Sequence, residues 1–433
     1  MLYTNLLGRF KQSNLLRGFA STTIWGGLSK LITLVVTFYC SNTLSKEGFG
    51  EYSFVKNTLN MVLVICATHF SSLAVKFATE SMQSIISLKR LYILVGFIIT
   101  VGLVCGILIL AIPLEIIQSF TGGESVSFFV KVMGLLLPVF ILQPIVASIL
   151  RGYKEFNRAG IYETAVAFFF LLITVAGVQL WGYHGAIYAI LAYYAINSII
   201  GVVVLWSYNK KKHYIGRVDE LRSERKVLWT MIVPVFLMSF VEAPLNWVSQ
   251  AEMGRRATYA MVGSLSVIMS IRYIIQILPT YFYQAFIPHA TQLFANGKHE
   301  EYYQKYKQIS RALLLILLVV IPLLIVFGKF LLSLYGKGYV ENYPSLLLSL
   351  AIIPMLLYGT LFKTNMIIHE HQRIMLWMTI ISSVLYIGFF YILILNGVNA
   401  LDSVLIAQSL QYAVQLVYGL LFYLRDKKAI REF

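Results

Sequence analysis

Long apolar segments recur along this chain, and they limit its fold more than any other feature. A helix needs about 20 mostly apolar residues to cross a bilayer, and the 433-residue sequence offers about twelve such stretches. They are continuous rather than alternating, which argues against a β-barrel. Only 12% of the residues are charged, about half the share in an ordinary soluble domain. The predicted fold is therefore an all-α polytopic membrane protein. Its expected transmembrane helices cover residues 19–40, 52–76, 91–112, 126–150, 159–180, 184–207, 228–250, 258–283, 312–334, 345–367, 374–395 and 400–424.

Positively charged loop residues indicate how the chain is oriented. If the N-terminus is cytoplasmic, most of the 35 Lys and Arg residues fall in cytoplasmic loops, and the loops on the opposite side hold only Lys46, Arg255, Arg256, Lys329 and Lys337. Because Lys and Arg accumulate in the cytoplasmic loops of membrane proteins, both termini are expected in the cytoplasm. The net charge of +16 is then a signal of topology, and nucleic acid is not an expected partner.

The two halves of the chain resemble each other. Gly182, before the sixth segment, is separated from Gly397, before the twelfth, by almost the same interval as Pro138 from Pro354. Six helices per half is an even number, so the halves are predicted to be parallel repeats, and we expect them to surround a central cavity. The predicted organisation is an interfacial helix at 1–18, six-helix bundles at 19–207 and 228–424, a basic cytoplasmic linker at 208–227 and a cytoplasmic tail at 425–433.

Four charged residues lie inside apolar segments: Lys30, Lys56, Glu242 and Arg272. A charge near the bilayer centre costs about 2.5–3.5 kcal/mol, so these side chains are expected to face the central cavity. A guanidinium binds phosphate oxygens bidentately and a lysine adds a mobile charge. Arg272, Lys30 and Lys56 are therefore predicted to bind an anionic substrate. Polar residues that recur on the same helix faces are predicted to line the cavity: Ser29, Thr33, Asn57, Asn60, Asn246 and Gln276.

Glu242 is the carboxylate of this set, and two interpretations of it stay open. It is a candidate coupling site for an H⁺ or Na⁺ gradient, because carboxylates at membrane depth are typical of ion and proton pathways. The alternative is a counter-ion to Lys30, Lys56 or Arg272 that only fixes helix packing. Lys363 lies near the end of its segment and is expected to extend to the membrane surface.

Prolines interrupt the seventh and eighth segments. Pro234 lies in the first half of the seventh segment and Pro244 in its second half, and Pro279 lies towards the end of the eighth. Proline removes a backbone hydrogen bond and kinks a helix. All three are candidate hinges for a conformational change, and fixed bends are an equal alternative.

The sequence lacks the patterns of metal and nucleotide chemistry. His369-Glu370-His371 does not have the H-E-x-x-H spacing that places two histidines on one helix face, so it is expected to be a solvated cytoplasmic loop. No D-x-D or Walker A sequence is found, and the three cysteines are not spaced as a disulfide or metal set. No cofactor and no metal site are predicted, and a transporter is favoured over an enzyme.

Two short motifs resemble a known family. Leu44, Phe49, Gly50 and Tyr52 form an L-x-x-x-x-F-G-x-Y pattern, and residues 150–156 resemble the loop after the family's fourth helix. The family is the polysaccharide transporter family of the MOP exporter superfamily, and within it the chain is most similar to O-antigen (Wzx-type) flippases. The resemblance implies a twelve-helix MATE-like fold in the bacterial inner membrane, with a cationic cavity lined by helices one, two, seven and eight.

The same resemblance implies a function and partners. It implies that an undecaprenyl-pyrophosphate-linked oligosaccharide, such as an O-antigen repeat unit, is moved from the cytoplasmic to the periplasmic leaflet by alternating access. The expected partners are this substrate, membrane lipids and other membrane proteins of glycan assembly. A MATE-like drug/cation antiporter is the first alternative, although it would need an acidic cavity. A membrane-embedded enzyme of glycan assembly is the second, and it would need a carboxylate or histidine pair at one membrane face.

Overall fold

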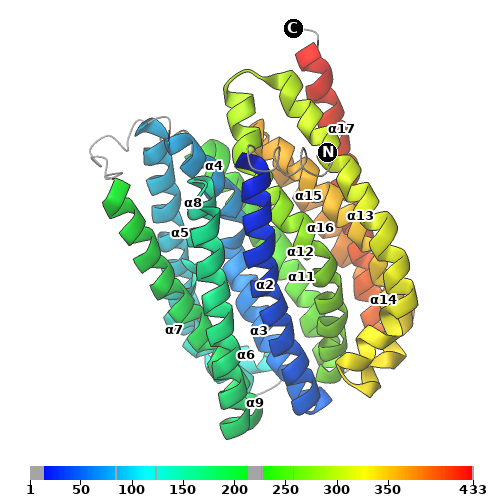
Figure 1. The fold of residues 1–433 in the computed structure, drawn as a ribbon. Coiled ribbons are helices and arrows are strands. Elements are labelled where there is room, and N and C mark those ends of the chain that lie inside the picture. Colours follow the sequence, from blue (N-terminus) through cyan, green and yellow to red (C-terminus); the bar gives the residue numbers. More distant parts are fainter. Residues whose placement is uncertain are drawn as a thin grey trace, which may run out of the picture.

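The computed structural model describes residues 14–82, 85–121, 124–212, 226, 228–256 and 258–431, and this part of the chain is a bundle of helices without strands (Figure 1). The elements in chain order are α2 (Asn14–Thr43), α3 (Lys46–Cys66), η1 (Thr68–Phe70), α4 (Ser71–Ser81), α5 (Ile85–Ala111), α6 (Leu114–Thr121), α7 (Glu124–Phe140), α8 (Gln143–Gly152), α9 (Phe156–Lys212), η3 (Leu228–Ile232), α11 (Val233–Arg256), α12 (Tyr259–Ala295), α13 (His299–Leu334), η4 (Lys337–Asn342), α14 (Tyr343–Leu350), α15 (Ile352–Ile368), α16 (Gln372–Leu395) and α17 (Ala400–Arg431).

The membrane assignment is confirmed by the length and composition of these helices. Ten helices in the described ranges are long and apolar enough to cross a membrane, or eleven if the bent pair α3 and α4 is one span. The longest of them, α9, contains two helices that meet at a kink at Trp181 and Gly182. Gly182 has a φ of 58°, a left-handed conformation that glycine adopts without strain. The two arms of α9 correspond to the predicted segments 159–180 and 184–207.

Several predicted segments are single spans that the structure breaks into two helices. The span of α3 and α4 bends by 47° around η1. The predicted segment 126–150 consists of α7 and α8, and the segment 345–367 consists of α14 and α15. Continuous apolar sequence does not reveal such breaks, because hydropathy reports burial in lipid and not the direction of the helix axis.

The helices form two groups that meet along four of their members. In the first group α2 packs on α9 and α4 on α8, and in the second α17 packs on α15 and α16. Between the groups, α12 packs along α2 and α3, and α11 packs on α3. These are the first two helices of each predicted half. The start of α2 and the end of α17 lie at the same end of the bundle (Figure 1).

Parts of the expected organisation lie outside the described residues. Residues 1–13 of the expected interfacial helix are not described, and 14–18 are continuous with α2. Most of the expected linker is also not described, whereas α9 continues to Lys212. The described part of the expected tail, up to Arg431, continues α17.

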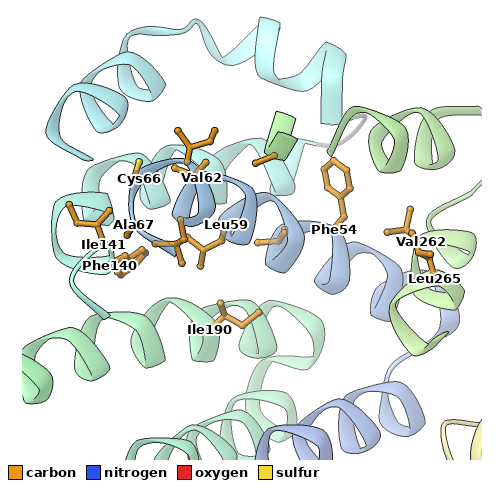
Figure 2. Packing of buried hydrophobic residues seen from close by; sticks show 14 of the residues in the cluster. Phe54, Leu59, Val62, Cys66, Ala67, Phe140, Ile141, Ile190, Val262 and Leu265 are labelled. Carbon is orange, nitrogen blue, oxygen red and sulfur yellow. The ribbon is translucent and has the colours of Figure 1, made fainter. Parts of the chain in front are cut away.

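Apolar side chains fill the contact between the two groups. In Figure 2 the side chains of α3 lie between those of α9 and α12. All of the residues concerned are buried: Phe54, Leu59, Val62, Cys66, Ile190, Val262 and Leu265. Within a bilayer, such packing stabilises helix association through van der Waals contact and close approach rather than through exclusion of water.

The F-G-x-Y motif lies at a close approach between α3 and α12. Phe49 and Tyr52 are fully buried. A Cβ atom added to Gly50 would lie 2.0 Å from the carbonyl oxygen of Tyr259, so only glycine fits there. The Ser45 hydroxyl accepts a hydrogen bond from the Gly48 amide at 3.1 Å and caps the start of α3. The motif thus begins a helix and fits its first turn against α12.

Charged residues between the two halves

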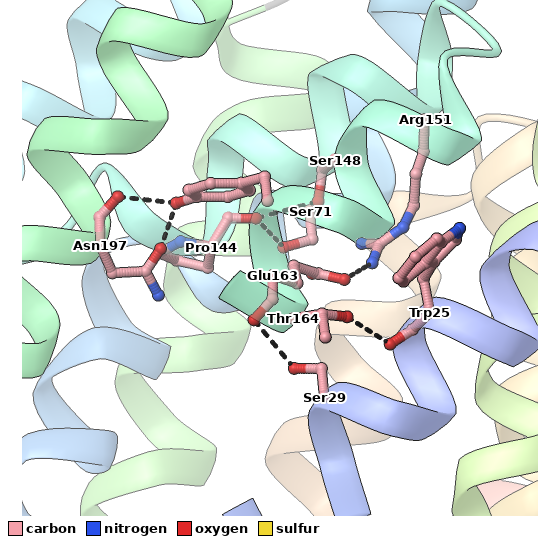
Figure 3. Close-up of polar contacts among 10 residues, drawn as sticks. Trp25, Ser29, Ser71, Pro144, Ser148, Arg151, Glu163, Thr164 and Asn197 are labelled. Carbon is pink, nitrogen blue, oxygen red and sulfur yellow. Dashed lines mark hydrogen bonds and ion pairs between the residues drawn. The ribbon is translucent and has the colours of Figure 1, made fainter. Parts of the chain in front are cut away.

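The first group of charged residues surrounds Glu163 of α9. The Arg151 guanidinium, from the end of α8, lies 2.5 Å from the Glu163 carboxylate. The Ser29 hydroxyl donates a hydrogen bond of 3.2 Å to the Glu163 carbonyl oxygen, and Figure 3 shows both contacts. Lys30, one residue further along α2, interacts electrostatically with Glu163 and Arg151. Thr33 donates a hydrogen bond to the Ser29 carbonyl oxygen, so its hydroxyl is occupied within α2.

Lys56 extends this group from α2 to α3. It interacts electrostatically with Lys30. The neighbouring Asn57 donates a hydrogen bond of 2.8 Å to Gln250 of α11, which joins the first half to the second. Asn60 accepts a hydrogen bond of 3.0 Å from the Tyr194 hydroxyl of α9. The Lys30 side chain is exposed, and it interacts electrostatically with charged residues of α8, α9 and α3.

The second group begins at Arg272 of α12. The Arg272 side chain is 3% exposed, and its guanidinium donates a hydrogen bond of 3.3 Å to Gln408 of α17. Gln276, one turn further, is also buried. Among the described residues, the Arg272 Nε and Gln276 Nε2 atoms have no hydrogen-bond partner. Buried donors without partners are costly, so this part of α12 has unused capacity to bind an anionic or polar ligand.

Glu242 of α11 belongs to the second group, but its charged neighbours are not the predicted ones. Its carboxylate interacts electrostatically with Lys363 of α15 and His69 of η1, and it forms a hydrogen bond with Gln415 of α17. Lys363 is half-buried and interacts electrostatically with this carboxylate, and its extension to the membrane surface stays a prediction. Asn246 donates a hydrogen bond of 2.8 Å to the Glu242 carbonyl oxygen.

His69 lies at the bend between α3 and α4 and was not singled out in the sequence. Its Nδ1 atom shares a hydrogen bond of 2.9 Å with the Ser239 hydroxyl of α11, one turn before Glu242. The signal that could have found it is a histidine inside the predicted segment 52–76. Its partner could not be predicted, because a contact between η1 and α11 depends on how the halves pack.

Together the two groups carry more positive than negative charge. The predicted residues do not form one cluster, because Lys30 and Lys56 belong to the first group whereas Arg272 and Glu242 belong to the second. Five cations and two carboxylates make up the groups, with His69 in addition: Lys30, Lys56, Arg151, Arg272 and Lys363 against Glu163 and Glu242.

The three prolines lie in helices that continue through or past them. Pro244 lies inside α11, and Pro234 lies at its start, directly after the π-helical turn η3. Pro279 is buried within α12, which runs unbroken from Tyr259 to Ala295. These positions are compatible with hinges and with fixed bends, so the hinge interpretation stays a prediction.

Polar contacts join the two halves at both ends of the bundle. At one end, the Lys46 ammonium lies 3.0 Å from the Glu341 carboxylate. At the other end, the Lys76 ammonium lies 3.0 Å from the Glu370 carboxylate. Lys154 also donates a hydrogen bond of 2.7 Å to Gln292 at this second end. The charged residues described above therefore lie between two polar contact zones.

Comparison with known proteins identifies the family and the fold of the chain. The sequence model of a family described as "Polysaccharide biosynthesis protein" matches residues 15–294. An outward-facing structure of a multidrug resistance MATE family transporter of the MOP superfamily is similar at a TM-score of 0.73 and 16% identity, with 97% of this chain and 96% of that chain covered. An inward-facing structure of such a transporter is similar at a TM-score of 0.70 and 14% identity, covering 93% and 96%.

A third similar structure differs in its binding pocket. It is a MOP superfamily transporter from Pyrococcus furiosus, described with a reverse polarity of the binding pocket that suggests a different function. Its TM-score is 0.71 at 16% identity, and 96% of both chains is covered. No curated protein sequence matches the chain. At these identities the structural matches establish the MATE-like fold, and the family match adds the link to polysaccharides.

Proposed function

The chain belongs to the polysaccharide biosynthesis protein family and has the fold of MATE transporters, and on this premise we propose that it is a flippase for a lipid-linked oligosaccharide. The proposed substrate is an undecaprenyl-pyrophosphate-linked oligosaccharide, such as an O-antigen repeat unit for lipopolysaccharide. Its movement runs from the cytoplasmic to the periplasmic leaflet by alternating access. The family match supports a glycan as the substrate, and the MATE-like fold supports transport rather than catalysis.

The surplus of cations in the two groups of charged residues is the observation that carries this proposal. A pyrophosphate bears several negative charges, and buried Arg and Lys side chains offset them best where water is scarce. Arg272 is buried, and its Nε atom has no hydrogen-bond partner in the described part of the chain. Lys30 and Lys56 lie on the two helices that face α12. These three side chains are the proposed binding residues for the pyrophosphate.

The polar residues around these cations are proposed to contact the sugars. Asn57 and Asn60 of α3 and Gln276 of α12 present amide groups, which hydrogen-bond sugar hydroxyls as donors and acceptors. Asn57 and Asn60 already bind Gln250 and Tyr194, so substrate would exchange with these partners. Such an exchange would link the arrival of substrate to a change in the contact between α3 and α11.

Alternating access is proposed to use the contact zones at the two ends. Because Lys46–Glu341 and Lys76–Glu370 both join the halves, one zone must separate while the other holds for substrate to enter or leave. Glu242 is the proposed site of coupling to an H⁺ or Na⁺ gradient. The electrostatic interactions with Lys363 and His69 also support its alternative role as a counter-ion.

The proposed location is the bacterial inner membrane, with both termini in the cytoplasm. The start of α2 and the end of α17 lie at one end of the bundle (Figure 1), as an even number of spans requires. Most Lys and Arg residues of the loops belong to that side. The Lys76–Glu370 end is then the cytoplasmic one, and membrane lipids and other membrane proteins of glycan assembly are proposed partners.

A drug/cation antiporter shares the fold but fits the charge less well. A cationic drug needs unpaired carboxylates, whereas Glu163 contacts Arg151 directly and Glu242 interacts with Lys363. The proposal is tested by deleting the gene and measuring lipid-linked oligosaccharide on the cytoplasmic face of the inner membrane. Accumulation that the wild-type gene reverses is expected. Normal levels of these intermediates together with increased drug sensitivity would overturn the flippase and favour the antiporter.

A further inference from the structure

The turn between α15 and α16 brings two histidines against a carboxylate of α17. The His371 Nε2 atom lies 3.1 Å from Asp426 Oδ1, and the His369 Nδ1 atom lies 3.8 Å from Asp426 Oδ2. One ligand atom from each of the three residues lies within 4.8 Å of the other two. The sequence spacing predicted a solvated loop here, whereas the His369 side chain is only 8% exposed. The spacing of the two histidines could not reveal the third residue of the cluster, because Asp426 is distant in the sequence.

These three side chains have the spacing of metal ligands. Imidazole nitrogens and carboxylate oxygens bind zinc at about 2.0–2.2 Å in a tetrahedral arrangement, which puts neighbouring ligand atoms about 3.4 Å apart. The observed distances of 3.1 and 3.8 Å lie on either side of this value. Small side-chain rotations would therefore be enough to coordinate an ion. His371 is 24% exposed, which leaves one side open to water as a fourth ligand.

The surroundings orient the carboxylate. Asn365 donates a hydrogen bond of 3.4 Å to Asp426 Oδ2, and the Tyr302 hydroxyl donates one of 2.6 Å to Asn365 Oδ1. Such outer contacts are typical of metal sites. Arg425 lies 3.8 Å from the same carboxylate, but it is 60% exposed and its guanidinium lies 4.5 Å from the Phe422 ring. It therefore approaches Asp426 from outside.

The backbone between the two histidines is held in an unusual conformation. Glu370 has a φ of 62°, in the left-handed region that non-glycine residues rarely occupy. Such conformations persist where the surrounding structure fixes them, and they cluster at ligand sites and switch regions. Glu370 is also the residue that contacts Lys76 of the other half. A pocket of about 340 Å³, lined by His369, Glu370 and Lys76 among others, gives access to the turn.

We propose that His369, His371 and Asp426 form a binding site for a divalent transition-metal ion of the zinc class, with water as the fourth ligand. The bound ion fixes the turn that carries Glu370 to Lys76. Two imidazoles and one carboxylate suit zinc, cobalt or nickel, whereas magnesium and calcium prefer oxygen ligands alone. The site lies outside the two groups of charged residues, and binding to it does not depend on the flippase proposal.

The test is metal binding by the full-length protein, purified in detergent with its affinity tag removed. Zinc content is measured by mass spectrometry after equilibration with Zn²⁺, and Co²⁺ absorption reports the ligand geometry. One zinc per chain and a tetrahedral cobalt spectrum are expected. His371→Ala and Asp426→Asn should weaken zinc binding by at least about 100-fold, since even outer contacts are worth about 10–100-fold. Asp426→Asn preserves the shape of the side chain if His371→Ala fails to fold.

His184→Gln is the matched control, because His184 lies at the start of the second arm of α9, where its ring packs near those of Tyr183 and Phe129, and it takes no part in the cluster of His369, His371 and Asp426. It should bind zinc as the wild type does. Failure of the wild-type protein to bind zinc at micromolar concentrations would overturn the metal site. Unchanged binding in both ligand variants would do so as well. Neither result bears on transport, which is measured separately by the accumulation of lipid-linked oligosaccharide.

Discussion

The Lys76 ammonium lies 3.0 Å from the Glu370 carboxylate, and this ion pair joins the two halves at the proposed cytoplasmic end. Lys76 is only 4% exposed, and a second carboxylate, Glu80, lies 3.9 Å away. The ion pair at the opposite end, Lys46–Glu341, is 45% and 70% exposed. Glu370 is 57% exposed, but the burial of Lys76 weakens screening by water and salt, so the Lys76–Glu370 contact is expected to hold the halves together more strongly than the Lys46–Glu341 contact.

Charge reversal at Lys76 should open the cytoplasmic end. Lys76→Glu places a carboxylate beside those of Glu370 and Glu80, and Lys76→Glu with Glu370→Lys restores opposite charges between the halves. An ion pair of this kind is worth about 1 kcal/mol, or about a fivefold change in population. We expect Lys76→Glu to raise the labelling rate of a cysteine at Asn57 by thiol reagent from the cytoplasmic side, and the double variant to restore it. Equal labelling rates in Lys76→Glu and in the control Lys46→Glu would contradict the assignment of the Lys76–Glu370 contact to the cytoplasmic end.

Reversal of the charge at Arg272 should abolish glycan export. A charge-assisted hydrogen bond contributes about 1.5–3 kcal/mol, so Arg272→Glu should reduce export at least about tenfold. Arg272→Lys keeps the charge but not the bidentate geometry, and it should retain part of the activity. The assay is complementation of the deletion strain at matched protein levels. Arg255→Glu, at a residue 62% exposed near the end of α11, is the control and should complement fully. Full complementation by Arg272→Glu would argue against a cationic binding site.

Glu242 and Lys363 should behave as a pair if Glu242 is a counter-ion. Glu242→Gln leaves the Lys363 charge without its partner, which costs about 3 kcal/mol at a fully buried site and less here because both side chains are partly exposed. Glu242→Gln with Lys363→Gln should recover the thermal stability that the single variant loses. If Glu242 instead carries protons, the double variant should recover stability while transport no longer depends on pH. Transport by both variants with an unchanged pH profile would exclude coupling at Glu242.

Glycine at position 50 should be irreplaceable for steric reasons. A Cβ atom there would lie 2.0 Å from the Tyr259 carbonyl oxygen, and overpacking of this kind costs about 1–3 kcal/mol or more. Gly50→Ala should therefore lower the thermal unfolding midpoint. Gly388→Ala in α16 is the matched control, because nothing lies within 4 Å of its added Cβ. It should leave the midpoint unchanged or raise it, as alanine favours helix by about 1 kcal/mol. The packing argument fails if the two variants are equally stable.

The sequence predicted the membrane-spanning segments because a helix that crosses a lipid bilayer must be long and mostly apolar. The turn at Gly182 was placed correctly, since glycine follows a run of helix-forming residues there. The bend between α3 and α4 was not predicted, because residues 52–76 are apolar on both sides of Ala67. Hydropathy contains no information about a change of axis inside the membrane.

The charged residues were individually visible in the sequence, but their partners were not. Glu242 and Arg272 stand out because a charge inside an apolar segment is costly. The electrostatic interaction of Glu242 with Lys363 links α11 to α15, and no local pattern encodes it. Whether the Lys363 ammonium also extends to the membrane surface stays a prediction.

The close approach of Gly50 to Tyr259 has a mechanical consequence. Because no side chain separates the two backbones, this contact has little room to deform, and it can serve as the pivot of a rigid-body rotation. The end of α4 lies about 40 Å from Gly50 at 1.5 Å per residue, and a tilt of about 10° around this contact would move it by about 7 Å. Because this distance is long, a small rotation about the contact near one membrane surface would be enough to open a gap for a headgroup at the other surface.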